Sequence, residues 1–196
     1  MEDNHAPLSP EFQQALLYAA RLHRGQRRKS SRTPYLGHLL GVVSLVLDCG
    51  GSEAEATAAL LHDAVEDQGG LTVLEEIRDL FGTEVAEIVD GCTDAYTQPK
   101  PPWRERKEGF LESLDTASPS IKLVSLADKV HNARSLHREL ILHGPEIWGS
   151  FKGGKEGPLW YYRELVRRLD DSPCPYLVDE FRELVNRLHR TAESVE

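Results

Sequence analysis

One short segment of the chain concentrates side chains that could do chemistry. The stretch ALLHDAVEDQGG, residues 59–70, begins as an apolar helix and then places His62 beside Asp63, with Glu66 and Asp67 close behind. Three carboxylates this close together repel one another unless a positive group lies among them. Imidazole nitrogens and carboxylate oxygens are also ligands that a divalent metal accepts, with open positions left for water. The segment therefore indicates part of a metal site.

The remaining ligands of such a site must come from elsewhere in the chain, because two ligands do not hold a metal. His38 follows Pro34 by four residues and has apolar neighbours on an expected helix. Asp128 interrupts VSLADKVHNARSL, an otherwise amphipathic helix, where an unpaired buried carboxylate is costly. Each has a simpler explanation, His38 as a satisfied core histidine and Asp128 as a salt-bridge partner. Four such residues together favour a shared ion.

Three motifs carry a resemblance to a known family. TPYLGH, ALLHDAVED and LVSLADKVHN resemble the motifs of the HD metal-dependent phosphohydrolases, over about residues 19–140. Within that superfamily they are similar to the hydrolase domains of RelA/SpoT-type proteins and to the stand-alone small alarmone hydrolases of bacteria and metazoa. The resemblance implies one divalent cation, most often manganese, although iron(II), cobalt or zinc would also suit such a site. The implied ligands are His38, His62, Asp63 and Asp128.

The resemblance also implies that Glu66 and Asp67 are the catalytic pair. In metal-assisted hydrolysis, the cation lowers the pKa of a water molecule, and a nearby carboxylate takes the proton as that water attacks phosphorus. The sequence leaves open which carboxylate does which task. The simpler alternative is that both side chains cap the helix end or face solvent.

Positive charge for a polyphosphate is concentrated in HRGQRRKSSR, residues 23–32. Arg28 and Lys29 resemble the pair that precedes the PY-x-x-H motif in the family, where those residues meet the base and phosphates. This chain has one residue more than the family between Lys29 and Pro34, so the alignment of Arg28 and Lys29 with the family pair could be shifted by one position. The alternative for this charge run is a solvated loop.

The helix that carries Asp128 offers further candidates. Asn132 and Ser135 follow Asp128 by four and seven residues, which places them on nearly the same face of the helix. Asn132 resembles the base-contacting residue of the family, so both side chains are expected to contact the substrate. Arg134 points away from that face and favours a structural salt bridge. His131 stands where the relatives usually have an apolar or aromatic residue, and its role is open.

A glycine-rich loop, FKGGKEG at residues 151–157, leads into Trp160, Tyr161 and Tyr162. Glycines allow the backbone to approach a phosphate closely, and an aromatic ring could stack on a base. Lys155 and Tyr162 are therefore the expected substrate contacts here. The alternative is a surface loop followed by core aromatics. A P-loop is excluded, because no G-x-x-x-x-G-K-[ST] run follows a strand.

Composition limits the class of protein. The 196 residues are 40% hydrophobic and 28% charged, which is typical of a globular chain. The net charge of −9 disfavours nucleic-acid binding. No apolar run approaches the ~20 residues that span a bilayer, and the acidic N-terminus is unlike a secretory signal. The scattered Cys49, Cys92 and Cys174 argue against a disulfide frame and favour the reducing cytoplasm.

Hydrophobic periodicity predicts an all-α fold, a single HD-domain helical bundle over residues 1–196. Its core is expected over about residues 9–143, with C-terminal helices over 158–190 packing on it. Helix starts are predicted from Ser52 with Glu55, from Thr72 with Glu75, and from Ser118-Pro119. The expected helices are 9–24, 35–48, 52 to 64 or 65, 72–81, 83–92, 105–114, 118–143, 158–170 and 176–190. No alternating strand pattern is present.

These observations lead to one expected function with two alternatives. The leading expectation is a cytoplasmic enzyme that removes the 3′-pyrophosphate of guanosine tetra- or pentaphosphate, giving GDP or GTP and pyrophosphate, with adenosine analogues as further substrates. One alternative is an HD-type nucleotide or NADPH phosphatase that releases inorganic phosphate. The other is a nucleotide-sensing module without catalysis. The expected partner is the nucleotide itself, with no nucleic acid or membrane, and the apolar helix faces leave a homo-oligomer open.

Overall fold

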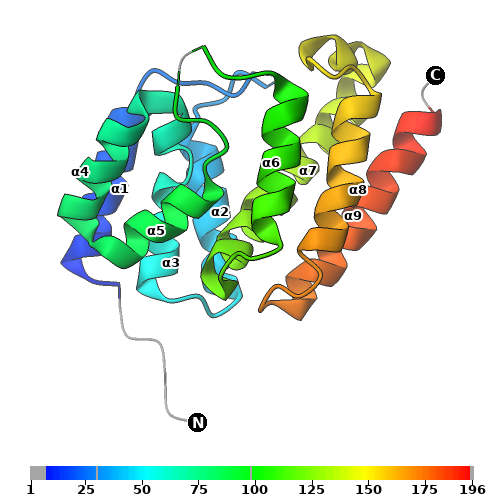
Figure 1. Cartoon of the computed structure of the whole chain (residues 1–196). Helices are drawn as coiled ribbons and strands as arrows, with labels where there is room; N and C mark the ends of the chain where they lie inside the picture. Colours follow the sequence, from blue (N-terminus) through cyan, green and yellow to red (C-terminus); the bar gives the residue numbers. More distant parts are fainter. Residues whose placement is uncertain (1–7, 30, 98, 195–196) are drawn as a thin grey trace.

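The fold is a set of helices joined by short connections (Figure 1). The computed structural model describes residues 8–29, 31–97 and 99–194. Within those ranges there is no strand, and Arg27 and Pro34 form an isolated bridge. The all-α prediction is therefore confirmed. The described elements are α1 (Pro10–Leu22), α2 (Leu36–Asp48), α3 (Glu53–Leu61), η1 (Val65–Gly69), α4 (Leu71–Phe81), α5 (Thr83–Cys92), α6 (Trp103–Leu114), α7 (Pro119–His143), η2 (Gly144–Ser150), α8 (Glu156–Arg168) and α9 (Pro175–Ser194).

Two of the predicted helix starts are present as hydrogen-bonded caps. At the start of α3, the Ser52 hydroxyl accepts from the backbone N–H of Glu55 at 3.2 Å, while the Glu55 carboxylate accepts from the backbone N–H of Ser52 at 2.7 Å. At the start of α7, the Ser118 hydroxyl accepts from the backbone N–H of Ile121 at 3.3 Å. These caps satisfy N–H groups that have no partner inside the helix.

The predicted cap at Thr72 is wrong. Helix α4 begins one residue earlier, at Leu71, and no side chain caps it. The chain turns at Gly70, whose φ is +60°, and a Cβ on Gly70 would lie 2.3 Å from the carbonyl oxygen of Tyr96. Close approach of a distant segment therefore determines this helix start, and the local pattern does not.

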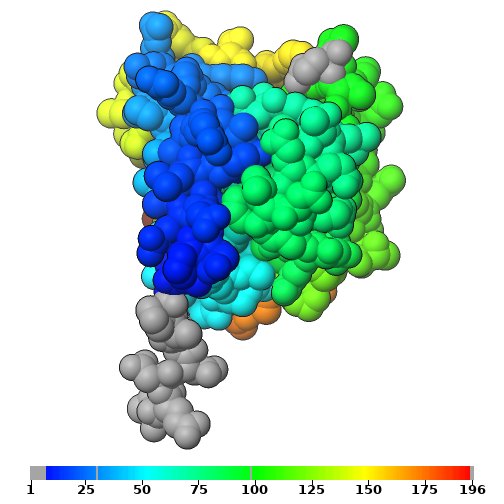
Figure 2. All heavy atoms as spheres, turned by 90° about the vertical axis from the view of Figure 1, so that its left-hand side faces the viewer, coloured from blue at the N-terminus to red at the C-terminus, as the bar shows by residue number. Residues whose placement is uncertain are grey.

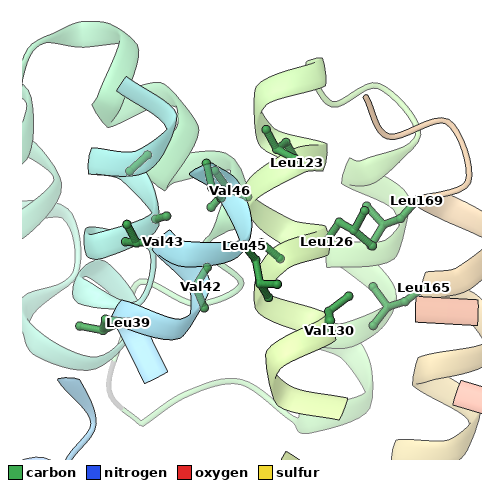
Figure 3. Close-up of a cluster of buried hydrophobic side chains, with 14 of the residues drawn as sticks. Leu39, Val42, Val43, Leu45, Val46, Leu123, Leu126, Val130, Leu165 and Leu169 are labelled. Atoms are coloured by element: carbon green, nitrogen blue, oxygen red, sulfur yellow. The ribbon is translucent and has the colours of Figure 1, made fainter. Parts of the chain in front are cut away.

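Helix α7 lies at the centre of the core. Figure 3 shows its side chains facing α2 on one side and α8 on the other, with Leu126 and Val130 between Leu45 and Leu165. Helix α9 also packs against α7, and α8 packs against α6 and α9. Buried apolar residues of all the α-helices of the described chain join one cluster. We infer a single domain in which the C-terminal helices pack on the preceding bundle.

Helix α1 covers one face of the molecule beside α4 (Figure 2). The Tyr18 hydroxyl of α1 donates to the Glu76 carboxylate of α4 at 2.8 Å, and the Tyr18 ring lies 5.7 Å from the ring of Phe81. The basic segment follows directly from α1. Its Gln26 amide donates to the Asp67 carboxylate at 2.7 Å, so the packing of α1 brings this segment next to η1.

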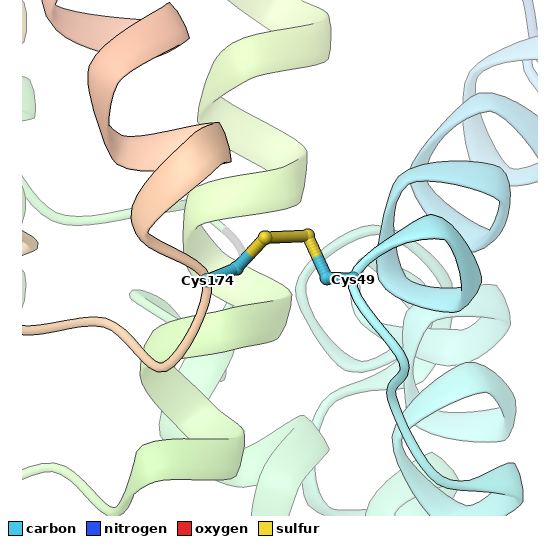
Figure 4. The surroundings of a disulfide bond; sticks show 2 residues. All are labelled: Cys49 and Cys174. Carbon is cyan, nitrogen blue, oxygen red and sulfur yellow. A yellow bond between two sulfur atoms is a disulfide. The ribbon is translucent and has the colours of Figure 1, made fainter. Parts of the chain in front are cut away.

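A disulfide joins Cys49, at the C-terminal end of α2, to Cys174, directly before α9 (Figure 4). Their Cα atoms lie 5.7 Å apart, although 125 residues separate them along the chain. The prediction that the cysteines argue against a disulfide is therefore wrong. Spacing along the chain carries no information about which helix ends meet in the folded bundle. Cys92 is a free thiol.

Reduction of this disulfide is expected to destabilise the fold strongly. A cross-link across 125 residues removes loop-closure entropy worth about 5 kcal/mol from the unfolded chain. The free energy of unfolding in urea should fall by that order when a reducing thiol is added. A Cys49→Ser, Cys174→Ser double variant should show the lowered value with or without the thiol, and Cys92→Ser should respond to the thiol as the wild type does. Equal stability of the oxidised and reduced wild type would contradict this prediction.

Candidate metal centre

Three separate parts of the chain place four candidate ligands together. His38 lies in the first turn of α2, and Asp128 lies in the middle of α7. His62 and Asp63 occupy the turn between the end of α3 and η1. The residues His38, His62 and Asp128 are buried, each with 5% or less of its surface exposed. The start of α2, the end of α3 and the middle of α7 thus meet inside the bundle rather than at its surface.

The polar atoms of these residues converge. Nε2 of His38 lies 3.1 Å from Oδ1 of Asp128 and 3.5 Å from Oδ2 of Asp63. Nε2 of His62 lies 3.0 Å from Oδ2 of Asp63 and 3.5 Å from Oδ1 of Asp128. One ligand atom each from His38, His62 and Asp128 lies within 4.8 Å of the other two, and such a group could hold a metal ion. Asp63 adjoins the group through both imidazoles.

The donor set fits a divalent cation. Nε2 of His38 and Nε2 of His62 are both buried and have no hydrogen-bond partner among the described residues. A buried polar atom without a partner costs about 1–3 kcal/mol. Nδ1 of His62 lies 2.8 Å from the carbonyl oxygen of Ala59, which only accepts, so that nitrogen carries the proton and donates. Although burial opposes the charge, Asp63 and then Asp128 raise the pKa of His62 well above its ordinary value, so in the absence of a metal the ring is cationic and Nε2 also carries a proton. A divalent cation would replace that proton, and the lone pair of Nε2 would then face the ion, as metal ligation requires.

The two carboxylates of the group are ionised. Burial opposes the charge on Asp63 and on Asp128, but nearby cationic groups hold the pKa of each carboxyl well below its ordinary value. For Asp63 the main cationic neighbour is His62, and for Asp128 it is Lys129. Two negative charges beside two imidazoles give the site a net attraction for a cation.

Hydrogen bonds from surrounding side chains hold these carboxylates in place. The Tyr35 hydroxyl donates to Asp63 at 2.5 Å, and the Asn132 amide donates to Oδ1 of Asp128 at 2.6 Å. The Lys129 ammonium donates to the other oxygen of Asp128 at 2.6 Å. The salt-bridge explanation for Asp128 therefore applies to one oxygen, while the other faces the histidines. Such outer partners orient metal ligands in proteins.

His131, whose role the sequence left open, lies against one of the candidate ligands. Its Nδ1 atom is 2.9 Å from Nδ1 of His38. Burial, with further contributions from His38 and Arg28, lowers the pKa of His131 to about 4. The ring is therefore neutral at ordinary pH.

Glu66 and Asp67 lie on η1, beside the candidate metal group. Their side chains are 21% and 24% exposed, so both reach the edge of the site. The ammonium group of Lys100 donates to Glu66 at 2.7 Å and to Asp67 at 2.8 Å. Burial, with the charges of Asp94 and Asp63, raises the pKa of Glu66 to about 7. A carboxyl with that pKa exchanges protons readily near neutral pH.

A group of charged residues next to this pair was not predicted from the sequence. Lys100, in the proline-rich loop, bridges Glu66 and Asp67, and Arg106 and Lys107 of α6 both pair with Asp94. Although burial opposes it, Lys107 and Arg106 lower the pKa of Asp94 to about 2. The signal was the surplus of carboxylates in the 59–70 segment, which required cations from another part of the chain.

The candidate substrate residues are distributed unevenly around the site. Arg28 lies over the ring of Tyr35, at 5.9 Å from the ring centre, and Asn132 contacts Asp128. The exposed side chain of Lys29 and the half-buried side chain of Ser135 form no hydrogen bond or ion pair with the described residues. The structure thus brings Arg28 and Asn132 next to the candidate ligands.

The prediction for Arg134 is confirmed. Its guanidinium donates to the Glu180 carboxylate through Nε at 2.9 Å, which joins α7 to α9 away from the candidate ligands.

The C-terminal candidates lie at the start of α8. Lys155 directly precedes this helix and is half-buried. Tyr162 is buried, and its ring packs at 6.2 Å from that of Phe181. Burial and then the charge of Asp128 raise the pKa of Tyr162 far above its ordinary value. The Tyr162 side chain is therefore buried and lies close enough to Asp128 to be influenced by its charge.

A groove of about 820 Å³ lies between the proline-rich loop and the start of α8. Its lining residues include Lys100, Trp103, Arg104, Lys152 and Trp160. The guanidinium of Arg104 lies 3.3 Å from the ring centre of Trp160. The groove thus combines positive charge with aromatic surface, and Lys100 connects it to the Glu66 and Asp67 pair.

Comparison with known proteins agrees with this arrangement. Residues 15–157 match the family model described as the HD domain. A Xenopus tropicalis protein named guanosine-3′,5′-bis(diphosphate) 3′-pyrophosphohydrolase MESH1 is 44% identical over 128 residues, which cover 64% of this chain and 69% of that protein. The Homo sapiens protein of the same name is 43% identical over 138 residues, covering 69% of this chain and 72% of that protein.

A solved structure is similar over nearly the whole chain. It is described as a metazoan orthologue of SpoT that hydrolyses ppGpp and plays a role in starvation responses. The superposition has a TM-score of 0.79 with 30% sequence identity, and it covers 96% of this chain and 99% of the other. The matched segment contains both histidines and both aspartates of the candidate metal centre. The chain therefore belongs to the HD-domain family.

Proposed function

We propose that this protein is a metal-dependent phosphohydrolase that removes the 3′-pyrophosphate from guanosine tetra- or pentaphosphate, giving GDP or GTP and pyrophosphate. The relatives with 43% and 44% identity carry the name of that activity, and the similar solved structure is described as hydrolysing ppGpp. The observation that carries the proposal is the convergence of two buried imidazole nitrogens, Nε2 of His38 and Nε2 of His62, on the carboxylates of Asp63 and Asp128, beside Glu66 and Asp67.

One divalent cation is proposed to be the cofactor, with Mn²⁺ as the expected ion. Nitrogen and oxygen donors with open positions suit Mn²⁺, and the geometry supports a shared ion between the two imidazoles and the carboxylates. A cation bound there would supply a Lewis acid for a phosphoryl oxygen and a water molecule of lowered pKa. The proposed ligands are His38, His62, Asp63 and Asp128.

Glu66 is proposed as the base that receives the proton of the attacking water. The oxygen of that water forms a bond to the phosphorus attached to the 3′-oxygen, and the bond from phosphorus to the 3′-oxygen breaks. The 3′-oxygen then takes up a proton, so that one water is consumed for each pyrophosphate released. Asp67 shares Lys100 with Glu66 and is proposed to orient the water. Lys100 and Arg106 supply positive charge for the polyphosphate on this side.

The pH dependence of the reaction should report the ionisation of Glu66. Below its pKa, the carboxyl is protonated and cannot accept a proton from water, so kcat/KM should fall as the pH is lowered. The midpoint of this fall should lie at about pH 7 or lower, because burial raises the pKa of Glu66 to about 7 and a bound cation can only lower it. Rates measured from pH 5 to 9 at saturating Mn²⁺ test this. A rate that rises toward acid pH would contradict it.

The substrate is proposed to be held on the side of the basic segment and α7. Arg28 and Asn132 lie next to the candidate ligands and are proposed to contact the base and phosphates. The remaining proposed contacts are Lys29, Ser135, Lys155 and Tyr162. Adenosine analogues are proposed as further substrates, since nothing in this set of side chains is specific to guanine.

The partner of the chain is proposed to be the small nucleotide. A net charge of −9 disfavours nucleic acid. In the part of the chain that the structure describes, every helix is too short or too polar to cross a bilayer. The cytoplasm stays the proposed location, although the Cys49–Cys174 disulfide removes one argument for it. A homo-oligomer stays a prediction.

A substrate panel tests the proposed function. The metal-free protein would be supplied with Mn²⁺ and offered guanosine tetra- and pentaphosphate, the adenosine analogues, NADPH and nucleoside monophosphates, with products separated by chromatography. Pyrophosphate and GDP or GTP should appear from the guanosine compounds. Inorganic phosphate as the product would decide for a phosphatase. Tight nucleotide binding without any product would decide for a sensing module.

A further inference from the structure

The contact between His131 of α7 and His38 of α2 has a defined chemistry. The two ring centres lie 4.8 Å apart, and the two Nδ1 atoms lie 2.9 Å apart. A hydrogen bond between two imidazole nitrogens needs one nitrogen that carries a proton and one that does not. The two rings must therefore be in complementary tautomers.

The surroundings of His38 decide which ring donates. Its Nε2 atom is buried, lies 3.1 Å from Asp128, and has no hydrogen-bond partner among the described residues. A ligand nitrogen needs a free lone pair, so the proton of neutral His38 must be on Nδ1. Nδ1 of His131 is then the acceptor. We propose that His131 is a positioning residue, which accepts the Nδ1–H of His38 and thereby keeps Nε2 of His38 open toward the cation.

The other candidate ligand does not need such a side chain. Nδ1 of His62 is held by the backbone carbonyl of Ala59 at 2.8 Å, within its own helix end. Among the described residues, the hydrogen-bond partner of Nδ1 of His38 is the side chain of His131. Replacement of His131 should therefore act on one of the two imidazole ligands and leave the other in place.

Gly41 gives His131 the room to make this contact. A Cβ on Gly41 would lie 2.4 Å from both Cδ2 and Nε2 of the His131 ring. The glycine is in α2, three residues after His38, so the same helix face that carries the ligand also seats its partner. His131 also lines an open pocket of about 350 Å³, together with Gly41, Ser44 and Arg134. A substitution of His131 would thus not leave a closed cavity in the core.

The test uses two substitutions that differ in one property. His131→Phe keeps a ring but removes the acceptor, whereas His131→Asn places an amide oxygen near the position of Nδ1. The inference rests on the proposed metal site, so the main measurement is the Kd of the metal-free protein for Mn²⁺. We expect His131→Phe to weaken Mn²⁺ binding by about 10–100-fold, and His131→Asn to stay within about threefold of the wild type, because it keeps an acceptor. Nitrogen NMR of the Zn²⁺-loaded wild type should show the His38 proton on Nδ1.

A second pair of variants tests the same contact without altering either histidine. Gly41→Ala should displace the His131 ring and weaken Mn²⁺ binding in the same direction. Gly109→Ala on α6 is the matched control, because a Cβ there meets no atom within 4 Å, and it should bind Mn²⁺ as the wild type does. Circular dichroism of each variant establishes that the helices are retained.

The outcomes separate this inference from the proposed function. If folded His131→Phe and Gly41→Ala bind Mn²⁺ as tightly as the wild type, the positioning role is wrong, while pyrophosphate release by the wild type would still support the proposed function. If His131→Asn binds Mn²⁺ as weakly as His131→Phe does, the proposed role of His131 as a hydrogen-bond acceptor is wrong. If the wild type itself binds no Mn²⁺, Co²⁺ or Zn²⁺, the metal site and this inference both fail.

Discussion

Replacement of His62 by alanine should abolish metal-dependent hydrolysis. The substitution removes one of the two imidazoles and leaves Asp63 and Asp128 facing each other with less positive charge between them. Removal of an outer partner of a ligand already costs about 10–100-fold in affinity or activity. Loss of the ligand itself should therefore lower kcat/KM by more than about 10³-fold at micromolar Mn²⁺.

Two measurements check this effect. A titration of the metal-free protein with Mn²⁺ should show binding for the wild type and none for His62→Ala in the micromolar range. Pyrophosphate release from guanosine tetraphosphate should follow the same order, and a chelator should remove the wild-type activity until Mn²⁺ is restored. The matched control is His143→Ala, at the exposed end of α7, which should behave as the wild type. A wild-type rate for His62→Ala would exclude this residue as a ligand.

Replacement of Glu66 by glutamine should have the second-largest effect, with a different signature. Glutamine has the size of glutamate and can accept the hydrogen bond from Lys100, but it cannot take a proton from water. General-base catalysis contributes about 10²–10⁴-fold, so kcat should fall by that factor. The affinity for Mn²⁺ should change little, because Glu66 is not among the proposed ligands.

The comparison of kcat and metal affinity makes this prediction specific. A loss in kcat with an unchanged Kd for Mn²⁺ assigns a chemical role to Glu66, whereas a parallel loss of both would make it part of the metal site. Glu112→Gln, an exposed change on α6, is the matched control. If Glu66→Gln keeps the full kcat and Asp67→Asn loses it, the two carboxylates have exchanged the proposed roles.

Local features of the fold were predictable because their causes lie within a few residues. The Ser52 and Glu55 capping box and the Ser118 cap are hydrogen bonds between a side chain and a backbone N–H three residues away, and both are present. Apolar periodicity likewise located the helices. Where a distant segment of the chain packs against a helix end, the local pattern did not predict where the helix begins. The Thr72 cap is absent because Gly70 turns against the Tyr96 carbonyl.

Features that depend on tertiary contact escaped prediction for the same reason. Lys100 lies more than thirty residues beyond the carboxylates that it bridges, and its loop was notable in the sequence only for its prolines. Cys49 and Cys174 meet because the ends of α2 and α9 adjoin, and their spacing of 125 residues does not reveal it.

By itself, the sequence determined the helical class of this protein and the residue types available for a metal site, because helix periodicity and ligand chemistry are properties of the side chains in order. The tertiary structure decided the surroundings of each group: which nitrogen of each histidine is held, which oxygen of Asp128 stays available, and how Gly41 admits His131 to His38. Hydrogen bonds and close packing act over a few ångströms in space, and only the folded chain brings such distant residues within that reach.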